Sequence, residues 1–560
     1  MNRRYVPILI VSLLLALPAL PGAQSDKAAM SASVVKQPLV RKSAEAITAA
    51  ELKDYLSFIA SDLMEGRATP SRGLDTTAQF LATTLARMGA KPGGDDGTYM
   101  QKIALKKERL VAEGTELQVG TQKFTYGKDF LATGTAGTVT GPMVYVGDGW
   151  YVKSKNIDAY QGLDVKGKVV IVNQVSGLPA GVTMADLMNG KRGEDWIDPM
   201  SYAQKKGALG AIALMSLMNQ ANPDNLEAMR KQVETGTYAV EKLPRSASQL
   251  PSVIVNVKVA QAIFAKEVTG ANAILATFAT GTPTGTPIKP FELSSDKKIT
   301  FTVKTTIEKT ATQNVVAIVE GSDPALKAEY VALGAHYDHV GTGNPINGDS
   351  IRNGADDDGT GTIGLLAIAD ALMKAPRHPK RSTLFVWHMG EEMGLWGSQY
   401  FTTFPTVPLD KIVAQLNIDM IGRTKPAGDT DPRDKDLSGP NEVYVIGSKM
   451  MSTELGQLSE AVNKEYLKLS FNYKYDDPKD PEKFFYRSDH VHYATKGIPI
   501  IFYFTGVHAD YHQPSDEVSK IDFGKYEKVT RTIYAMVWEV GELKARPKVD
   551  KPLKDVTMPF

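Results

Sequence analysis

The chain has 560 residues, which is long for a single hydrophobic core, and its 42% hydrophobic content favours globular folding in two or three domains. Its 64 basic and 63 acidic residues nearly cancel and form no sustained basic stripe, so we expect no nucleic-acid partner. The absence of cysteine excludes disulfides, thiol catalysis and cysteine-ligated zinc.

The N-terminal segment is typical of a secretory signal peptide. Arg3 and Arg4 form a basic start, residues 6–20 form an apolar stretch, and small residues ending at Ala23 suit a cleavage site. The apolar stretch falls short of the roughly 20 residues that a membrane-spanning helix needs, and prolines interrupt it. We therefore predict removal of residues 1–23, export to the periplasm or the extracellular space, and no stable membrane span in the mature protein.

The composition and periodicity of the remaining chain divide it into segments. Residues 24–43 are small, polar and without periodicity, which predicts a flexible spacer. Residues 44–129 begin with two segments of helical periodicity and are assigned to the N-terminal part of the main domain. Residues 130–290 contain short strands, glycine-rich turns and no histidine, which predicts a β-rich insert. The main domain resumes over residues 291–548, and residues 549–560 form a tail.

Strands alternate with helices in the second half of the chain. The predicted strands cover residues 299–307, 314–320, 329–336, 382–387, 413–419, 442–446 and 498–504, and the predicted helices cover residues 362–374, 393–404, 451–468 and 526–544. This alternation predicts an α/β fold in which a mostly parallel sheet carries helices on both faces.

Two neighbouring motifs, VALGAHYDH and NGADDDGTG, carry the strongest chemical signal. The first is a buried apolar strand that ends in His336 and Asp338. The second places Asp356, Asp357 and Asp358 at the start of a helix. A helix start needs one capping carboxylate, and three adjacent carboxylates repel one another, so a bound cation accounts for the cluster better than capping does.

Other candidate ligands also follow predicted strands. They are Glu391, Glu392, Asp419 and His512. Open α/β sheets place their sites where strands end, so we expect these side chains to converge. Imidazole ligands favour zinc over calcium or magnesium. In WHMGEEMG, one glutamate can bind metal while its neighbour stays free to take a proton from a metal-activated water.

The order and spacing of five motifs resemble the M28 family of co-catalytic zinc exopeptidases. These motifs are HYDH, GADDDGTG, GEEMG, NIDMIG and YHQPSD, and the loop LMEGRATPSRG extends the similarity to the N-terminal part. Within the insert, GPMVYVGDG, DAYQGLDVKGKVVIV and SYAQKKGALGAIAL resemble the protease-associated (PA) domain, a β-rich module of several hydrolases. The resemblance implies an aminopeptidase that acts on peptides, with two Zn²⁺ per chain.

The resemblance also implies a set of metal ligands. His336, Asp357 and Asp419 would hold one zinc. Asp357, Glu392 and His512 would hold the other, with Asp357 bridging the two ions.

Three further residues have implied roles in the reaction. Glu391 would be the general base, and Asp338 would orient His336, as metal-bound histidines usually require. The hydroxyl of Tyr511 would donate to the tetrahedral oxyanion. The remaining histidines near the motifs are expected to support the site or lie at the surface, and these are His339, His388, His490, His492 and His508.

Alternative functions share parts of this pattern. A glutaminyl-cyclase-like acyltransferase would use one zinc, a receptor-like relative would lack ligands, and a glutamate-type carboxypeptidase would need arginine to hold carboxylates. Residues 489–512 contain no arginine, and residues 500–504 are apolar as in a pocket for an uncharged side chain, which favours an aminopeptidase. A carboxypeptidase would need an arginine from elsewhere in the chain, such as Arg423 or Arg487.

Overall fold

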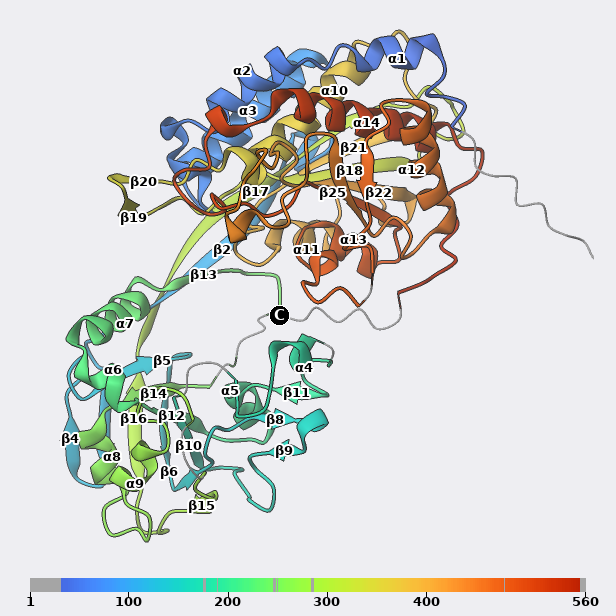
Figure 1. Ribbon diagram of the computed structural model, residues 1–560. Helices are drawn as coiled ribbons and strands as arrows, with labels where there is room; N and C mark the ends of the chain where they lie inside the picture. Colours follow the sequence, from blue (N-terminus) through green and yellow to red (C-terminus); the bar gives the residue numbers. More distant parts are fainter. Residues whose placement is uncertain are drawn as a thin grey trace, which may run out of the picture.

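The computed structural model describes residues 32–553 except 175–177, 189, 245–247, 249, 284–286 and 478, so the predicted signal peptide lies outside the described residues. Figure 1 shows a large lobe of sheet and helices above a smaller one, here called the insert lobe. Two long antiparallel strands, β2 (Met100–Leu110) and β17 (Thr305–Val319), connect the lobes. The chain leaves the large lobe along β2 and returns along β17.

The large lobe is built on a ten-stranded mixed sheet. Its order is β13 (Thr237–Val240), β2, β17, β21 (Ser382–His388), β18 (Tyr330–His336), β22 (Ile412–Ile418), β25 (Ile500–Phe504), β23 (Glu442–Ile446) and β24 (Ser470–Asn472), with β1 (Lys91–Pro92) beside β17. The central strands β21, β18, β22 and β25 are parallel and almost wholly buried. The predicted α/β fold is confirmed.

The sheet is less parallel than predicted, because both flanks contain antiparallel pairs. β17 runs against β2 and β21, and β23 runs against β25. The direction of each strand follows from the segment that connects it to the preceding strand. The chain returns along β17 from the far end of β2, whereas the central parallel strands are joined by crossovers that bring the chain back to the same edge.

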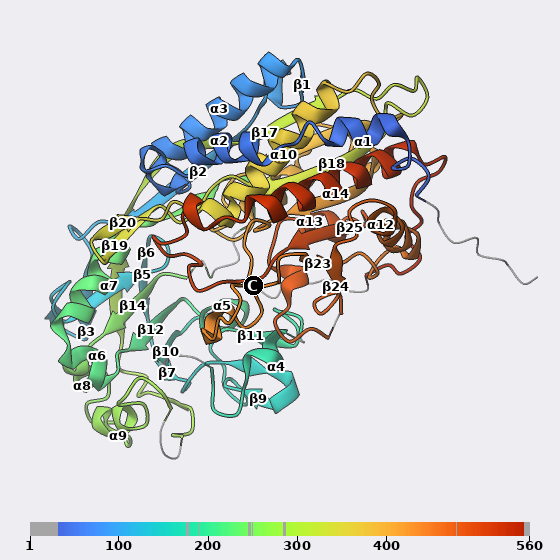
Figure 2. The ribbon, with the colours of Figure 1, turned by 45° about the horizontal axis from the view of Figure 1, so that its top comes forward.

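Helices cover both faces of the sheet, as predicted. The helices of one face are α2 (Ala49–Ile59), α3 (Arg72–Met88), α10 (Gly361–Met373), α12 (Thr453–Glu465) and α14 (Phe523–Glu542), and those of the other are α11 (Trp396–Thr403) and α13 (His490–Thr495). Figure 2 shows α2 and α3 over α10 and α14. Neighbouring residues of β18 serve opposite faces: Val331 and Leu333 join the first core and Ala332 the second.

The predicted spacer was wrong for its described C-terminal part. Pro38–Ala44 forms helix α1, and both Val35 and Val40 are fully buried. The backbone N–H of Val35 donates to Glu539 of α14 at 2.7 Å. The segment is too short to show helical periodicity, so only its tertiary contacts reveal that it belongs to the large lobe.

The insert lobe extends beyond the predicted bounds of residues 130–290. Its six-stranded sheet runs β15 (Phe291–Glu292), β7 (Met143–Tyr145), β10 (Val169–Asn173), β12 (Gly210–Leu214), β14 (Ser252–Val255) and β5 (Phe130–Thr133). A four-stranded sheet runs β4 (Gln122–Phe124), β3 (Glu116–Val119), β16 (Ile299–Val303) and β6 (Gly137–Gly141). Strands from both sides of the predicted insert therefore belong to this lobe: β3 pairs with β16, and β16 pairs with β6 inside the predicted insert. The resemblance to a PA domain stays a prediction.

Smaller elements complete the insert lobe. They are α4 (Met184–Met188), α5 (Pro199–Lys205), α6 (Leu217–Ala221), α7 (Pro223–Thr235), α8 (Val257–Ile263), α9 (Ala271–Ala276), β8 (Tyr151–Val152), β9 (Ile157–Asp158) and β11 (Trp196–Ile197). In the large lobe, the hairpin β19 (Thr342–Ile346) and β20 (Asp349–Ile351) projects from one edge (Figure 1). Within the described ranges, no helix has the length and apolar character to cross a bilayer.

Candidate metal centre

The candidate site lies where the central parallel strands end. His336 is the last residue of β18, Asp419 follows β22, and the turn with Glu391 and Glu392 follows β21. Asp357 lies in residues 355–360, a segment that leads into α10 and in which Asp357 and Asp358 have non-helical backbone angles. Parallel strands end at the same edge of a sheet, so side chains far apart in sequence meet there.

Three of the predicted ligands form a first group of donor atoms, group A. His336 Nε2 lies 3.3 Å from Asp357 Oδ1 and 3.6 Å from Asp419 Oδ1. All three residues are buried. Their donor atoms lie within 4.8 Å of one another, so one ion can contact all three.

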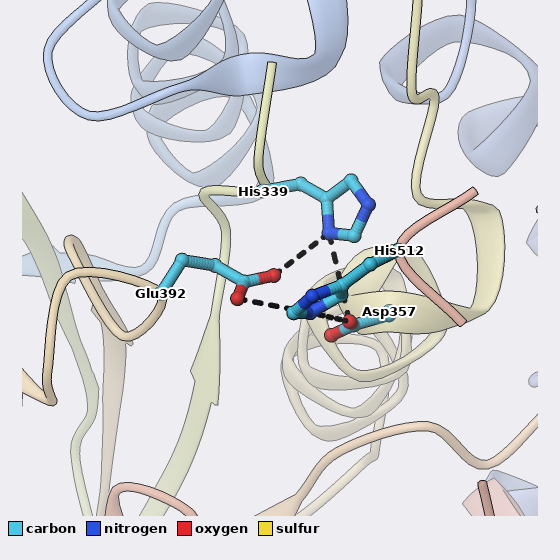
Figure 3. Close-up of side chains that lie close together, drawn as sticks. All are labelled: His339, Asp357, Glu392 and His512. Atoms are coloured by element: carbon cyan, nitrogen blue, oxygen red, sulfur yellow. Dashed lines mark ion pairs between the residues drawn. The ribbon is translucent and has the colours of Figure 1, made fainter. Parts of the chain in front are cut away.

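Four residues form a second group, group B, shown in Figure 3: His339, Asp357, Glu392 and His512. His512 Nε2 lies 3.1 Å from Asp357 Oδ2 and 3.0 Å from Glu392 Oε2. His339 Nδ1 lies 2.9 Å from Glu392 Oε1 and 3.6 Å from Asp357 Oδ2. The structure thus brings together all five predicted ligands and adds His339.

Asp357 belongs to both groups through different oxygens. Its Oδ1 faces His336 and its Oδ2 faces His339 and His512. Burial would raise the pKa of Asp357, but His336 and His512 outweigh burial and hold that pKa well below its ordinary value. A carboxylate that stays ionised and presents one oxygen to each donor group has the form of a bridging ligand.

The donor set fits metal ions, and zinc in particular. Zinc–ligand bonds of about 2.0–2.1 Å in a tetrahedral arrangement place neighbouring ligand atoms roughly 3.3 Å apart, close to the spacings in both groups. In group B, His339 Nδ1, Asp357 Oδ2, Glu392 Oε1 and His512 Nε2 are buried atoms without a hydrogen-bond partner. Buried polar atoms without partners are costly, and an ion among them removes that cost.

Glu391 lies beside group A and belongs to neither group. Its backbone N–H donates to Asp338 Oδ1 at 3.1 Å, which fixes the turn after β21. Burial raises the pKa of Glu391 well above its ordinary value, and the charges of Glu392 and Asp419 add to this effect while His336 opposes it. Glu391 is therefore a carboxyl next to the donor groups that is not itself one of the donors.

Asp338 connects the ligand loop to its surroundings. His336 Nδ1 lies 3.2 Å from the Asp338 backbone carbonyl and 3.6 Å from its carboxylate Oδ1. The hydroxyl of Thr69 donates to Asp338 Oδ2 at 3.1 Å. Asp338 is fully buried. Its contacts with Nδ1 fix the orientation of the His336 ring, so that Nε2 faces the other donors of group A.

Tyr511 lies against the outer side of group B. Its ring stacks on His512 with a centroid separation of 3.8 Å and an interplanar angle of 22°. Burial raises the pKa of Tyr511 well above its ordinary value, and the charges of Asp357, Glu392 and Glu391 raise it further. The phenol therefore keeps its proton and can act as a hydrogen-bond donor.

Two buried charged residues support the site without having been predicted. Arg67, in the LMEGRATPSRG loop, is fully buried and donates to the carbonyl oxygens of Tyr337, Asn353 and Gly354 at 3.0, 2.7 and 2.8 Å. Asp516, in YHQPSD, accepts the backbone N–H of Asp357 at 3.1 Å. Both residues lie in quoted motifs, but their roles depend on contacts between loops that no spacing along the chain reveals.

The other two acids of GADDDGTG also bind backbone. Asp358 Oδ1 accepts the N–H groups of Gly361 and Met420 at 2.8 and 3.0 Å. Asp356 Oδ1 accepts the N–H of Gly422 at 2.7 Å. The loop after β22 is thereby fixed next to the start of α10, so Asp357 remains the acid of the three that faces both donor groups.

Comparisons with known proteins agree on a peptidase domain. The family model described as "Peptidase family M28" matches residues 314–537, the segment that holds every member of groups A and B. The leucine aminopeptidase 2 of Trichophyton rubrum is 28% identical over 281 residues, which cover 45% of this chain and 50% of that protein. The probable leucine aminopeptidase 2 of Aspergillus fumigatus is 31% identical over 207 residues, or 36% of this chain and 35% of that protein. The chain thus spans about half, or less, of the length of these relatives.

Solved structures also match this chain, at lower identity. The aminopeptidase from Aneurinibacillus sp. strain AM-1 has a TM-score of 0.49 and 17% identity, covering 92% of this chain and 98% of that one. A zinc aminopeptidase from Bacillus subtilis has a TM-score of 0.46 and 17% identity, covering 91% and 99%.

Proposed function

We propose that this chain, whose residues 314–537 match the model of peptidase family M28, is an exported aminopeptidase that removes N-terminal residues from peptides with two zinc ions. The observation that carries the proposal is the position of Asp357, whose two oxygens face two separate groups of buried donors. The names of the curated relatives support leucine as the first residue to test at the peptide N-terminus.

His336, Asp357 and Asp419 would hold one zinc ion, and Asp357, Glu392 and His512 would hold the other. When bound, such a pair of ions polarises the scissile carbonyl and lowers the pKa of a water molecule toward neutrality. Ligands fixed by buried contacts, such as His336 against Asp338, keep this arrangement in place without reorganisation during the reaction.

The remaining residues then handle protons. Glu391 accepts the proton of the attacking water and delivers it to the leaving amine, since it lies beside the donor groups without belonging to them. Tyr511 donates its hydroxyl proton in a hydrogen bond to the oxyanion that forms at the attacked carbonyl.

A glutamate-type carboxypeptidase is the second candidate, because it would share the donor groups. It would need an arginine to hold the free carboxylate of its substrate. Arg423 is already engaged, with Nη2 2.7 Å from Asp510 and Nη1 3.6 Å from Asp516, and it is buried. Arg487 is exposed and stacks over Phe484 at 4.4 Å, so of these two arginines it is the more accessible.

The apolar strand Ile500–Phe504 does not contribute to this choice. It forms β25 at the centre of the sheet, and its side chains are almost wholly buried in the cores on either side. The predicted pocket for an uncharged side chain is therefore not formed by these residues.

The proposal is tested with leucyl-p-nitroanilide and with one peptide in two blocked forms. We expect release of p-nitroaniline, loss of activity with a chelator, its return with zinc, and two zinc ions per active chain. The peptide amidated at its C-terminus should be cleaved, and the same peptide acetylated at its N-terminus should not. The reverse pattern would establish the carboxypeptidase, and one metal per active chain would favour a cyclase-like site.

We also propose that the insert lobe is a PA domain that shapes access to the site. None of the residues in groups A and B lies between 130 and 290. The insert lobe supplies no donor atom but lies next to the lobe that holds the site. Its role would be to determine which peptides reach the site.

A further inference from the structure

We propose that His339 is a metal ligand, so that the two ions are held unequally, by three protein donors in group A and by four in group B. The inference rests on the proposed function for the presence of the ions. It differs from the expectation drawn from the motifs, in which His339 only supports the site and the ions have equal numbers of ligands.

The first observation is that the side-chain ring of His339 is buried without hydrogen bonds. Its exposed fraction is 1%, and neither ring nitrogen has a hydrogen-bond partner among the described residues. A buried imidazole in that state loses its hydration at both nitrogens, and no hydrogen bond replaces it. An ion bound at Nδ1 would compensate for that loss.

The second observation is the direction of the ring. Figure 3 shows Nδ1 of His339 facing the same space as the side chains of Glu392, Asp357 and His512. Nδ1 lies 2.9 Å from Glu392 Oε1 without forming a hydrogen bond to it. Donor atoms that approach one another without hydrogen-bond geometry are arranged around a common point, as ligands of one ion are.

The third observation is that the ring is held in place. A Cβ on Gly354 would lie 2.5 Å from His339 Cγ and 2.6 Å from Cδ2, so the ring lies directly against this glycine. The backbone N–H of His339 donates to the carbonyl of Arg67 at 3.1 Å. The ring therefore packs against the loop that carries Asp357, and it does not need to move to reach the ion.

The fourth donor changes the chemistry of group B. Zinc is commonly four-coordinate, so His339, Asp357, Glu392 and His512 would fill the coordination of one ion with protein atoms. Group A, with three protein donors, leaves a position for water or substrate, as catalytic zinc sites do. The ion in group B is then the one that is bound more tightly, and the ion in group A is the one that exchanges.

The test replaces His339 with asparagine, whose amide occupies nearly the position of Nδ1 and fills most of the ring's space. The control is His490→Asn, because His490 is also fully buried but lies outside both groups, stacked on Phe502. The zinc affinities are measured by competition with a series of chelators of increasing affinity. X-ray absorption spectroscopy counts the imidazoles bound to zinc. Thermal unfolding at saturating zinc verifies that each variant is folded.

In the wild type and in His490→Asn, we expect three zinc-bound imidazoles per two zinc ions. In His339→Asn, we expect two zinc-bound imidazoles per two zinc ions. One of the two zinc affinities should fall by roughly 100-fold or more in His339→Asn, beyond the 10- to 100-fold typical of residues that only orient a ligand. An unchanged affinity and an unchanged imidazole count in His339→Asn would overturn the proposal. A wild type that binds two ions with three imidazoles but does not hydrolyse aminoacyl substrates would instead overturn the proposed function and leave His339 as a ligand.

Discussion

The carboxylate of Asp338 accepts the backbone N–H of Glu391 at 3.1 Å, and this bond joins the loop after β18 to the turn after β21. Asp338 also lies beside His336 Nδ1. A single buried carboxylate thus positions both a proposed metal ligand and the proposed general base. Disturbing it should affect metal binding and proton transfer together, whereas changes to Glu391 or Glu392 should separate them.

Glu391→Gln is expected to keep both zinc ions and to lower kcat about a thousandfold, because the attacking water loses its proton acceptor. Glu392→Gln is expected to lose zinc, since it removes a charged donor from group B. Metal analysis and steady-state kinetics on the two variants check this contrast. Near-normal turnover in Glu391→Gln would show that another group is the base.

Asp338→Asn keeps an oxygen for the N–H of Glu391 but removes the negative charge next to His336. We expect a loss of roughly 10- to 100-fold in zinc affinity or activity, with the fold retained. Chelator competition and kinetics on the purified variant measure it. Asp96→Asn, at an exposed acid far along the chain from the site motifs, serves as the matched control and should change neither quantity. Equal effects of both substitutions would remove the positioning role of Asp338.

Arg67→Met should destabilise the large lobe by about 3 kcal/mol or more, because several buried carbonyl oxygens lose their charged donor. The free energy of unfolding is measured by denaturant titration with zinc removed, so that metal binding does not mask the effect. The exposed Arg72→Met is the control, and it should stay close to the wild type. A similarly small effect for Arg67→Met would show that these carbonyl contacts contribute little.

Because of Lys525, the stability of the large lobe should change with pH in the alkaline range. Burial lowers the pKa of Lys525 to about 8 from 10.5, although Asp356, Asp522 and Glu442 oppose the shift. Between these values the unfolded chain binds more protons than the folded one, so this group raises stability as pH rises from 8 to 10.5. Below pH 8 the amine of Lys525 is protonated while buried, which lowers the stability of the folded state.

Lys525→Met removes this pH dependence. The difference in free energy of unfolding between wild type and variant should grow in favour of the wild type by on the order of 3 kcal/mol across that window. Denaturant titrations of both proteins at several pH values between 7 and 10.5 measure it. A difference that stays constant with pH would show that Lys525 is not shifted.

Local sequence patterns were enough to predict most elements of the large lobe and five of the six residues in groups A and B. Apolar runs such as residues 331–334 identify buried strands from local composition, and His336, Asp357 and Glu392 are visible because polar residues interrupt such runs at their ends. These signals are local, so they need no knowledge of the rest of the fold. Helix α3 could be predicted in the same way, from its periodicity and its closing Gly89.

Which of these residues meet, and what holds them in place, depends on the packing of the folded chain. His339 joins group B because the loops after β18 and before α10 pack together, and Arg67 becomes structural because three distant carbonyl oxygens converge on it. Residues 237–240, which lie inside the predicted insert, pair as β13 with β2 at the edge of the main sheet. Each outcome depends on contacts between segments far apart in the chain, whose free energy comes from burial and hydrogen bonding in the folded state, and no local pattern encodes it.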